Sequence, residues 1–569
     1  MIWLTTSIAL LLGILALAVH AFAGRARIHR HGQRLSRPSD SLPILGNAIQ
    51  FLKPRHVLFD WFVKCQRVFG DETFEISVPS LPPGVVINSP VVLEYVLKNE
   101  ASITKGQFFT DRSWDLFGYG IINASGELWR AQRKAGLKFF SGTNLEVMVD
   151  DVLPDVYEDS IREGLLQAAR DRSVIDLQKV FHDLTTTVVG HMAYDMEIDA
   201  SSPFSKAFDH ASSQIGLRFQ NPLYRITEMF TGASFRASLV EVKRFGKQIV
   251  TEARKRRARD AFESLVTNTN EEEAKFNAQR TDPGADGHGL GFGTLIDSLI
   301  ESLGDPVIVA DAALNFLSAG RDTTAQSLTW TLYALLRHPD CLRRIRDEID
   351  AVFQPNDDKS GEYVHLHLAH LQPTSLPYTT ATFYEALRLY PPVPFEIKQT
   401  TQPVTLPDST SLPAGAIVVW CIWALNRSAR TFGADADSFN PGRWLEKDRA
   451  TTSDDVHFTG NARPVGEFPV FNGGPRSCLG KKMAEVMACW VLVRLLAEWE
   501  FEEVNDGLHM DAETGERRSA NSLTLPMEGG LPVRVRQRRK EAVGEGRNEA
   551  VGERRRKVQI EDGDGHDEQ

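Results

Sequence analysis

The stretch that decides the fold is Phe471-Asn-Gly-Gly-Pro-Arg-Ser-Cys-Leu-Gly480, a loop that places one cysteine, Cys478, among glycines, a proline and an arginine. Apolar residues recur at three- and four-residue steps over 481–499 and predict a helix directly after the loop. A thiol at a helix N-terminus lies near the positive end of the helix dipole and near free backbone N–H groups, which lower its pKa. We therefore expect Cys478 to be a thiolate that binds iron rather than a disulfide partner.

Five positions of the loop form the pattern Phe-x-x-Gly-x-Arg-x-Cys-x-Gly, filled by Phe471, Gly474, Arg476, Cys478 and Gly480. Glycine lets a flat ligand approach the backbone, and arginine adds a permanent positive charge. A structural cysteine before an ordinary helix is the alternative for an isolated motif. The pattern resembles the haem loop of the cytochrome P-450 monooxygenases. This resemblance implies haem b as the cofactor, with the Cys478 thiolate as the axial iron ligand that favours O–O cleavage.

The composition excludes some classes of protein. The 569 residues are 42% hydrophobic and 24% charged, which is typical of a globular chain with a sizeable core. A formal net charge of −11 argues against a general nucleic-acid binder. The five cysteines form no Cys-x-x-Cys pair, so they indicate a reduced compartment rather than a disulfide framework.

The N-terminus predicts a membrane anchor. Residues 2–23 contain no Lys, Arg, Asp or Glu and reach the roughly 20 residues that cross a bilayer. Five arginines follow between residues 25 and 37, which by the positive-inside rule leaves the catalytic part in the cytosol. A cleaved signal peptide ending at Ala21-Phe22-Ala23 is the alternative, but its charge would precede the apolar run. The family resemblance points to the cytosolic face of the endoplasmic reticulum.

These boundaries divide the chain into four parts. We predict a transmembrane signal anchor over 1–24, a basic, proline-containing connector over 25–46, and a catalytic domain over 47–536. The resemblance implies the cytochrome P-450 fold for that domain, mainly α-helical with small β-sheets. Residues 537–569 nearly repeat a short charged sequence and contain few large apolar side chains, which predicts a disordered tail.

Trp129 and Arg133 lie four positions apart on a predicted helix, so the indole N–H and the guanidinium can bind one anionic group. Taken alone, the pair fits a surface helix with one buried tryptophan equally well. In the resembled family, a Trp-x-x-x-Arg helix holds a haem propionate, and both positions match here.

A long helix is predicted from the cap Asp305 and Pro306 to His338-Pro339. It contains Ala319-Gly-Arg-Asp-Thr-Thr324, in which small residues leave room for a ligand and threonine hydroxyls compete for backbone carbonyls. A helix-packing contact with a solvent-exposed Arg–Asp pair is the alternative. The resemblance implies that this stretch binds dioxygen above the haem and that Asp322 and Thr323 deliver protons.

Glu385 and Arg388 are spaced i, i+3 on a helix predicted over 376–390. Such a pair contributes only about 0.2–0.5 kcal/mol and is common, so it identifies nothing alone. With Leu389-Tyr-Pro-Pro-Val-Pro394 after it, the pair resembles the family's Glu-x-x-Arg helix. Arg443 then matches the arginine that joins this pair in a buried network behind the haem loop, while Gly442 stands where many relatives have glutamate.

Other segments carry coarser expectations. We predict short strands in 74–87 and a helix over 90–98, mostly helices over 152–259, an exposed loop over 267–293, paired strands within 404–427, and a hairpin over 522–535. Relatives often have a basic residue near a haem propionate at the position of Lys398. His365, His367 and His370 resemble a metal tract, but we expect an exposed loop because no fourth ligand follows in sequence.

The motifs together predict an NADPH- and O2-dependent haem-thiolate monooxygenase that receives electrons through NADPH–cytochrome P-450 reductase and hydroxylates a hydrophobic substrate. Arg321 within 319–324, and the sequence of 116–123, are similar to the fungal alkane and plant fatty-acid ω-hydroxylase branch, so long-chain fatty acids or n-alkanes are the first choice. A fungal terpenoid or polyketide hydroxylase is the alternative. A haem-thiolate isomerase or dehydratase would need no proton relay, and a haem sensor would need no substrate access.

Overall fold

The structure is a computed structural model. It describes residues 13, 28–79, 81–199, 201–274, 294–352, 365–447, 456–504 and 507–538, with side chains described only to residue 262 in the range that ends at 274.

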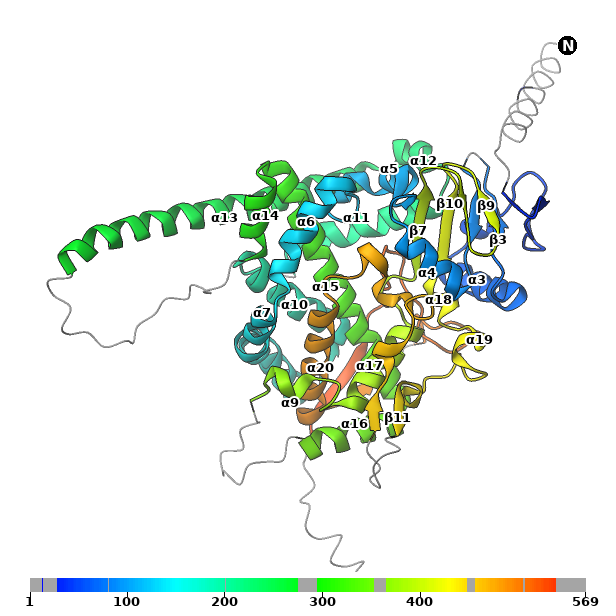
Figure 1. The fold of residues 1–569 in the computed structure, drawn as a ribbon. Coiled ribbons are helices and arrows are strands. Elements are labelled where there is room, and N and C mark those ends of the chain that lie inside the picture. Colours follow the sequence, from blue (N-terminus) through cyan, green and yellow to red (C-terminus); the bar gives the residue numbers. More distant parts are fainter. Residues whose placement is uncertain are drawn as a thin grey trace, which may run out of the picture.

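The fold is organised around α15 (Pro306–Arg337), which runs through the middle of the molecule (Figure 1). Asp305 caps it by accepting hydrogen bonds from the backbone N–H groups of Val307 and Ile308. Most of its side chains are buried, because α10, α13, α17 and α20 pack around it. A helix surrounded in this way is apolar on nearly every face. The predicted helix from Asp305 to His338 is therefore confirmed.

The helices make up most of the ordered chain. They are α2 (Ala48–Phe51), α3 (Arg55–Phe69), α4 (Pro90–Lys98), α5 (Gly106–Phe117), α6 (Gly126–Phe139), α7 (Gly142–Val147), α8 (Leu153–Val156), α9 (Glu163–Asp171), α10 (Leu177–Val189), α11 (Pro203–Gln220), α12 (Tyr224–Thr231), α13 (Ala233–Ala274), α14 (Leu295–Leu303), α16 (Pro339–Val352), α17 (Pro377–Leu389), α18 (Ile422–Leu425), α19 (Ala429–Phe432) and α20 (Lys481–Glu498), besides α15. Short π-helical segments occupy Met148–Val152, Tyr157–Arg162 and Gly190–Tyr194.

The strands form small sheets at the edges of this helical body. The largest has the order β3 (Phe74–Ile76), β4 (Gly84–Val86), β10 (Ile417–Cys421), β7 (Phe395–Thr400) and β5 (Ile103–Thr104). The others are β2 (Gln33–Arg34), β1 (His29–Arg30), β9 (Thr410–Leu412) and β8 (Val404–Thr405); β13 (Trp499–Glu503), β14 (Pro532–Gln537) and β6 (Val174–Asp176); and β11 (Leu445–Lys447) with β12 (Val456–Phe458). The predicted class, mainly α-helical with small sheets, is confirmed.

Three local predictions are wrong. The loop expected from Thr267 begins later, because α13 continues to Ala274 and extends away from the body (Figure 1); no glycine or proline interrupts the sequence between Thr267 and Pro283. Residues 275–293 lie outside the described residues. Two strand pairings also differ from expectation.

Strand β10 does not pair with the strand predicted before it. It pairs antiparallel with β7 and parallel with β4, whereas β8 pairs with β9. All five residues of β10 are buried, which suits the centre of a sheet. Similarly, β14 pairs with β13 and β6 rather than with 522–527, where the described contact is an isolated bridge between Ser519 and Met527.

The N-terminal and C-terminal predictions are described only in part. The anchor over 1–24 lies outside the described residues except for Gly13, and within the described ranges no helix is long and apolar enough to span a membrane. The connector contributes β1 and β2, which pair onto β9. Arg538 forms an ion pair with Asp350 at 2.7 Å, and the rest of the tail lies outside the described residues.

A buried carboxylate ties α17 to the segment before the cysteine loop. Glu385 accepts hydrogen bonds from both Arg388 Nε and Nη2 at 2.8 Å, from Arg443 Nε at 3.0 Å, from Trp444 Nε1 at 2.9 Å and from the Asn440 backbone N–H at 2.8 Å. The Glu385 and Arg388 side chains are both 0% exposed. Each lone pair and charge of this carboxylate thus has a partner, as a buried ion requires.

Replacing Glu385 with glutamine should lower the free energy of unfolding by about 3–5 kcal/mol, because Arg388 would keep a buried charge without its carboxylate. Urea unfolding of the haem-loaded protein, followed by circular dichroism, measures this change. The control is Asp437→Asn, which removes an exposed ion pair with Arg67 and should cost less than about 1 kcal/mol. Equal losses for the two variants would contradict the assignment.

Candidate active site

The cysteine loop is closed by its own backbone. The Cys478 N–H donates to the Phe471 carbonyl at 2.8 Å, and α20 begins three residues after Cys478. Gly474 has a φ of +60°, and a Cβ there would lie 2.3 Å from the Leu97 carbonyl oxygen. Only glycine combines that backbone conformation with such close packing against the end of α4. The loop geometry therefore explains why glycine occupies position 474.

The Cys478 side chain is exposed, although protein surrounds it densely enough that burial raises the pKa of its thiol. A hydrogen bond from the Gly480 backbone N–H and the positive charge of Arg133 lower the pKa but do not overcome burial. We expected the helix N-terminus to lower the pKa of this thiol. In the protein without its cofactor, that expectation is wrong. An iron cation bound at the sulfur would supply the missing positive charge and favour the thiolate.

Trp129 lies close to two guanidinium groups beside the loop. The Cζ of Arg476 is 4.6 Å and that of Arg133 5.7 Å from the centre of the Trp129 ring. Arg133 donates to the Ser477 carbonyl at 2.9 Å and to Ser477 Oγ at 3.2 Å. The indole N–H of Trp129 has no acceptor in the described part of the chain. The structure thus brings Trp129, Arg133 and Arg476 together next to Cys478, where they form a positive site for an anionic group.

Sequence reasoning missed Glu100, which joins two of the predicted basic residues. Its Oε1 accepts from Arg476 Nε at 2.8 Å, and its Oε2 accepts from Lys398 Nζ at 2.9 Å. Arg476 also donates to the Ala124 carbonyl at 2.9 Å. Lys398 is 1% exposed and its pKa is lowered by burial, so its amine is committed to Glu100. A carboxylate distant in sequence gives no local signal of such a pairing.

The middle of α15 carries an accessible strip within an otherwise buried helix. Ala319 is exposed, and Gly320 and Thr323 are half-buried. The Thr323 hydroxyl donates to the Ala319 carbonyl at 2.6 Å, as expected for a threonine within a helix. A Cβ on Gly320 would lie 2.9 Å from Val189 Cγ2, so this glycine lets α10 approach α15 instead of making room for a ligand.

Asp322 faces α10 in a buried ionic cluster. Its Oδ1 lies 3.2 Å from Arg321 Nη1 and 3.8 Å from His182 Nδ1, and Arg321 also donates to Asp209 at 2.8 Å. Burial raises the pKa of Asp322 to about 7 despite the opposing charge of Arg321. Burial lowers the pKa of His182 to about 4. Near neutral pH the Asp322 carboxyl can therefore both bind and release a proton.

The loop 117–124 is held against α15 by two side chains of that helix. Asp311 accepts from the Tyr119 N–H at 3.0 Å, and Asn315 accepts from the Ile122 N–H at 3.1 Å. A Cβ on Gly118 or on Gly120 would lie 2.0 Å from a side-chain atom of Asp311 or Asn315, respectively. The glycines of this stretch are thus required for its contact with α15.

Asp150, from a π-helical segment distant in sequence, lies beside the histidine tract. His367 Nδ1 lies 3.1 Å from Asp150 Oδ1, and one ligand atom each of Asp150, His365 and His367 lies within 4.8 Å of the others. All three side chains are exposed or half-buried, and such groups are common without a metal ion. The aspartate lies more than 200 positions earlier in the sequence, so the tract alone does not reveal it.

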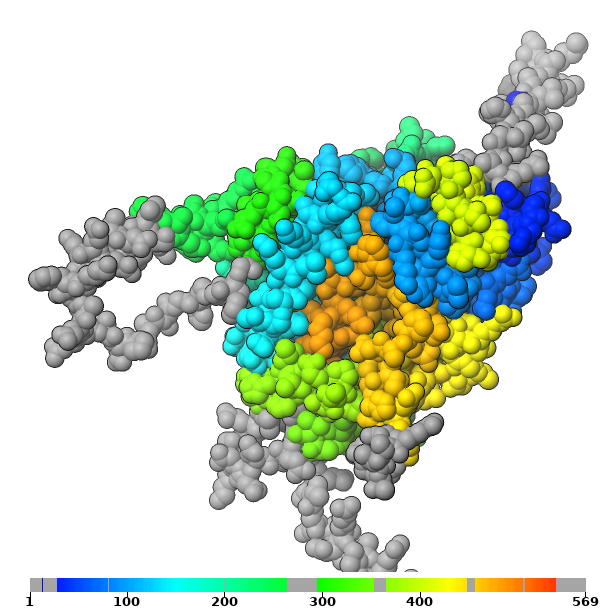
Figure 2. Space-filling view, in the orientation of Figure 1, coloured from blue at the N-terminus to red at the C-terminus, as the bar shows by residue number. Residues whose placement is uncertain are grey.

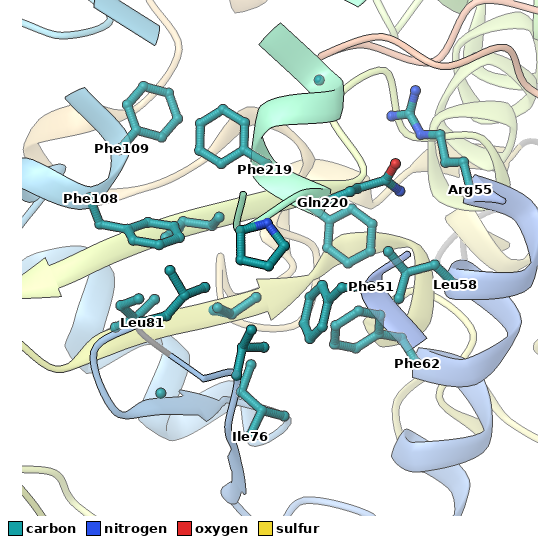
Figure 3. A pocket seen from close by; sticks show the side chains of 18 of the residues that line it. Phe51, Arg55, Leu58, Phe62, Ile76, Leu81, Phe108, Phe109, Phe219 and Gln220 are labelled. Carbon is teal, nitrogen blue, oxygen red and sulfur yellow. The ribbon is translucent and has the colours of Figure 1, made fainter. Parts of the chain in front are cut away.

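A mostly apolar pocket of about 150 Å³ lies between α2, α3, α5, α11 and the large sheet (Figure 3). Phe51, Phe62, Phe108, Phe109 and Phe219 are among its lining residues. The pocket reaches Leu523, and the next residue, Thr524, accepts a hydrogen bond from Gln326 on α15 at 2.8 Å. A hydrogen bond therefore joins the segment next to the pocket to α15, about one helical turn after Thr323.

A family model for cytochrome P450 matches residues 36–518. The chain belongs to the cytochrome P450 family. It is 30% identical over 477 residues to cytochrome P450 CYP94D109 of Paris polyphylla. The aligned residues cover 80% of this chain and 86% of that protein. It is 29% identical to cytochrome P450 monooxygenase cyp1 of Mycosarcoma maydis, over 87% of this chain and 74% of that protein. It is 27% identical to cytochrome P450 94B3 of Arabidopsis thaliana, over 88% of this chain and 91% of that protein.

Membership of the P450 family makes the protein an oxidoreductase that incorporates oxygen from O2. It implies haem with a cysteine thiolate ligand, a hydrophobic substrate and a redox partner. The residues described here fit haem, because an accessible thiol, a free indole N–H and two guanidinium groups lie together. Figure 2 shows the orange surface that includes the start of α20 in a hollow between the cyan α6 and the amber segment before the loop.

The raised pKa of Asp322 predicts a stability change with pH. A folded-state pKa near 7, above the usual 3.8, means that Asp322 favours folding at low pH and loses this contribution as pH rises to about 7. Asp322→Asn cannot ionise, so its melting temperature relative to wild type should increase between about pH 4 and 7 and then level off. Melting followed by circular dichroism tests this, with exposed Asp437→Asn as the control. A constant difference from wild type across that range would contradict the buried position of the carboxyl.

Proposed function

We propose that this chain is an NADPH- and O2-dependent monooxygenase that hydroxylates long-chain fatty acids or n-alkanes, with Cys478 as the axial ligand of haem b. The observation that carries the proposal is the accessible Cys478 thiol at the start of α20, beside Trp129 and two guanidinium groups. Electrons come from NADPH through NADPH–cytochrome P-450 reductase.

Each side of the site has a separate task. When bound, haem supplies the redox chemistry that inserts one oxygen atom from O2 into a C–H bond. Cys478 donates electron density from the loop side, and the Gly480 N–H stabilises its sulfur charge. Trp129, Arg133 and Arg476 bind the carboxylates of the cofactor. Phe471, Gly474 and Gly480 shape the loop, and Glu385, Arg388 and Arg443 fix the segment behind it.

On the other side, Asp322 and Thr323 supply protons. The pKa of about 7 lets Asp322 exchange protons near neutral pH, which is the condition for an effective acid–base group. The Thr323 hydroxyl donates a hydrogen bond to the Ala319 carbonyl, so its oxygen remains free to accept a hydrogen bond from water.

The choice of aliphatic substrates rests on two observations. The sequences of 116–123 and 319–324 resemble the fatty-acid and alkane hydroxylase branch of the family. The apolar pocket is lined mainly by phenylalanine, leucine, isoleucine and valine side chains, which suit a hydrocarbon chain.

The cysteine assignment can be tested by spectroscopy and turnover together. Cys478→Ala should lose the thiolate-type Soret band of the reduced carbon-monoxide complex and all reductase-dependent NADPH-coupled product, because no other ligand can provide the sulfur. Cys341→Ser, which changes another accessible cysteine, should retain both. A thiolate-type band that survives in Cys478→Ala would refute the ligand assignment.

Product analysis of wild type with a fatty acid, an n-alkane and a terpenoid tests the substrate class, and turnover of the terpenoid alone would overturn it.

Exposed apolar residues on α12 and at α2 support contact with a membrane, and we propose that this is the endoplasmic reticulum membrane, with the catalytic domain in the cytosol. Phe230 is 83% and Met229 73% exposed on α12, and Ile49 and Leu52 are exposed at α2. Phe51 of α2 and Pro222, just before α12, line the same pocket, so these two apolar surfaces are close together. Such a surface suits the bilayer interface.

Binding to phospholipid nanodiscs should slow amide hydrogen exchange in α12, because the lipid would cover its apolar residues. The comparison is α16, on the opposite side of the body (Figure 1), where exchange should not change. Unchanged exchange in α12 would contradict a membrane contact at this surface.

A further inference from the structure

The apolar pocket contains one charged side chain. Among the described residues that line it, Arg55 of α3 carries the only charge, and the polar groups besides it are uncharged. Figure 3 shows the Arg55 guanidinium and the Gln220 side chain at one end of the pocket, with Phe108 and Phe109 at the other. The charge therefore lies on one side of a pocket that is aromatic on both sides, since Figure 3 also shows Phe51 and Phe62 on the Arg55 side.

Arg55 is only 8% exposed, and its known partners are weak ones. Its Nη1 donates to the Ala520 carbonyl at 3.0 Å, and its Cζ lies 5.1 Å from the centre of the Phe59 ring. No carboxylate of the described chain lies within ion-pair distance of it. A guanidinium has five N–H donors, so most of its hydrogen-bonding capacity is unused here. By contrast, the buried Arg388 and Arg517 each pair with a glutamate at 2.8 Å.

An uncompensated cation in an apolar site is costly. Burial lowers the pKa of Arg55 to about 9, which still leaves the guanidinium charged at neutral pH. A buried charge is normally paired, and the planar guanidinium matches a carboxylate with two parallel hydrogen bonds. A single uncharged donor would be enough to hydrogen-bond the Ala520 carbonyl, so this bond does not explain a buried guanidinium. The unused donors thus point to an anionic group that enters the pocket from outside.

We infer that Arg55 binds the carboxylate of the substrate, so that the enzyme acts on long-chain carboxylic acids rather than on n-alkanes. This inference rests on the proposed function, because it identifies the substrate class of the same site. The phenylalanine side chains hold the hydrocarbon chain, while the amide of Gln220, which also lines the pocket, is a second donor for the head group. The ion pair fixes one end of the chain. The pocket lining includes Ser522 and Leu523, and the next residue, Thr524, accepts a hydrogen bond from Gln326 on α15.

Spectral titration of the haem-loaded enzyme with three ligands of equal chain length tests this inference. The ligands are dodecanoic acid, methyl dodecanoate and dodecane, measured through the spin-state change of the haem. Wild type should bind the acid about 10- to 100-fold more tightly than the ester, since a charge-assisted hydrogen bond is lost in the ester. In Arg55→Gln this preference should vanish because acid affinity falls, while ester affinity stays unchanged. Arg55→Lys should restore part of the preference.

The matched control is Arg67→Gln, which removes an exposed arginine from the same helix and should leave all three affinities unchanged. An equal loss for acid and ester in Arg55→Gln, or no preference for the acid in wild type, would overturn the inference while leaving the hydroxylase proposal intact. If Arg55→Gln does not load haem, Arg55→Lys and wild type still decide by their acid-to-ester ratios.

Failure of the proposed function gives a different result. If none of the three aliphatic ligands binds, the aliphatic substrate class is wrong, and a terpenoid carboxylic acid is compared with its methyl ester. A preference for that acid which disappears in Arg55→Gln supports Arg55 as the carboxylate-binding residue. Equal binding of that acid and its ester overturns it.

Discussion

The buried carboxylate of Glu385 is the interaction on which the arrangement of the site depends. It is the common acceptor for two arginines, a tryptophan and a backbone N–H that come from α17 and from the segment 440–444. Trp444 in turn packs against Phe468 with ring centres 4.9 Å apart, immediately before the cysteine loop. A single desolvated charge therefore fixes the chain that leads into Cys478. Because such a charge tolerates no loss of partners, the segment has little freedom to shift.

Much of the fold could be predicted from local signals. The cap and proline at 305–306 and the His-Pro at 338–339 mark both ends of α15, and Pro90 marks the start of α4. The strand partners could not be predicted in this way, since pairing of β10 with β4 joins residues more than 300 positions apart. The polar composition of 267–274 predicts a loop, but α13 continues through it because the stretch contains no glycine or proline and ends in three glutamates and an alanine, which favour helix.

The candidate site was predictable as a set of residues but not as a set of contacts. The motifs brought Trp129, Arg133 and Arg476 to one place, and Glu385, Arg388 and Arg443 to another. The sequence could not reveal that burial of the Cys478 thiol raises its pKa more than the Gly480 N–H and Arg133 lower it, or that Asp322 faces a histidine on α10. Arg55 was also missed, because a lone arginine in an amphipathic helix gives no sign of the pocket that surrounds it.

The pairing of Glu100 with both Arg476 and Lys398 has a consequence for cofactor loading. An anion arriving beside Trp129 competes with Glu100 for the Arg476 guanidinium. Because Lys398 holds the other carboxylate oxygen, Glu100 can release Arg476 without becoming an isolated buried charge. The ion pairs of Glu100 therefore hold the Arg476 guanidinium beside Trp129, and Lys398 would leave Glu100 paired if an anion took its place at Arg476.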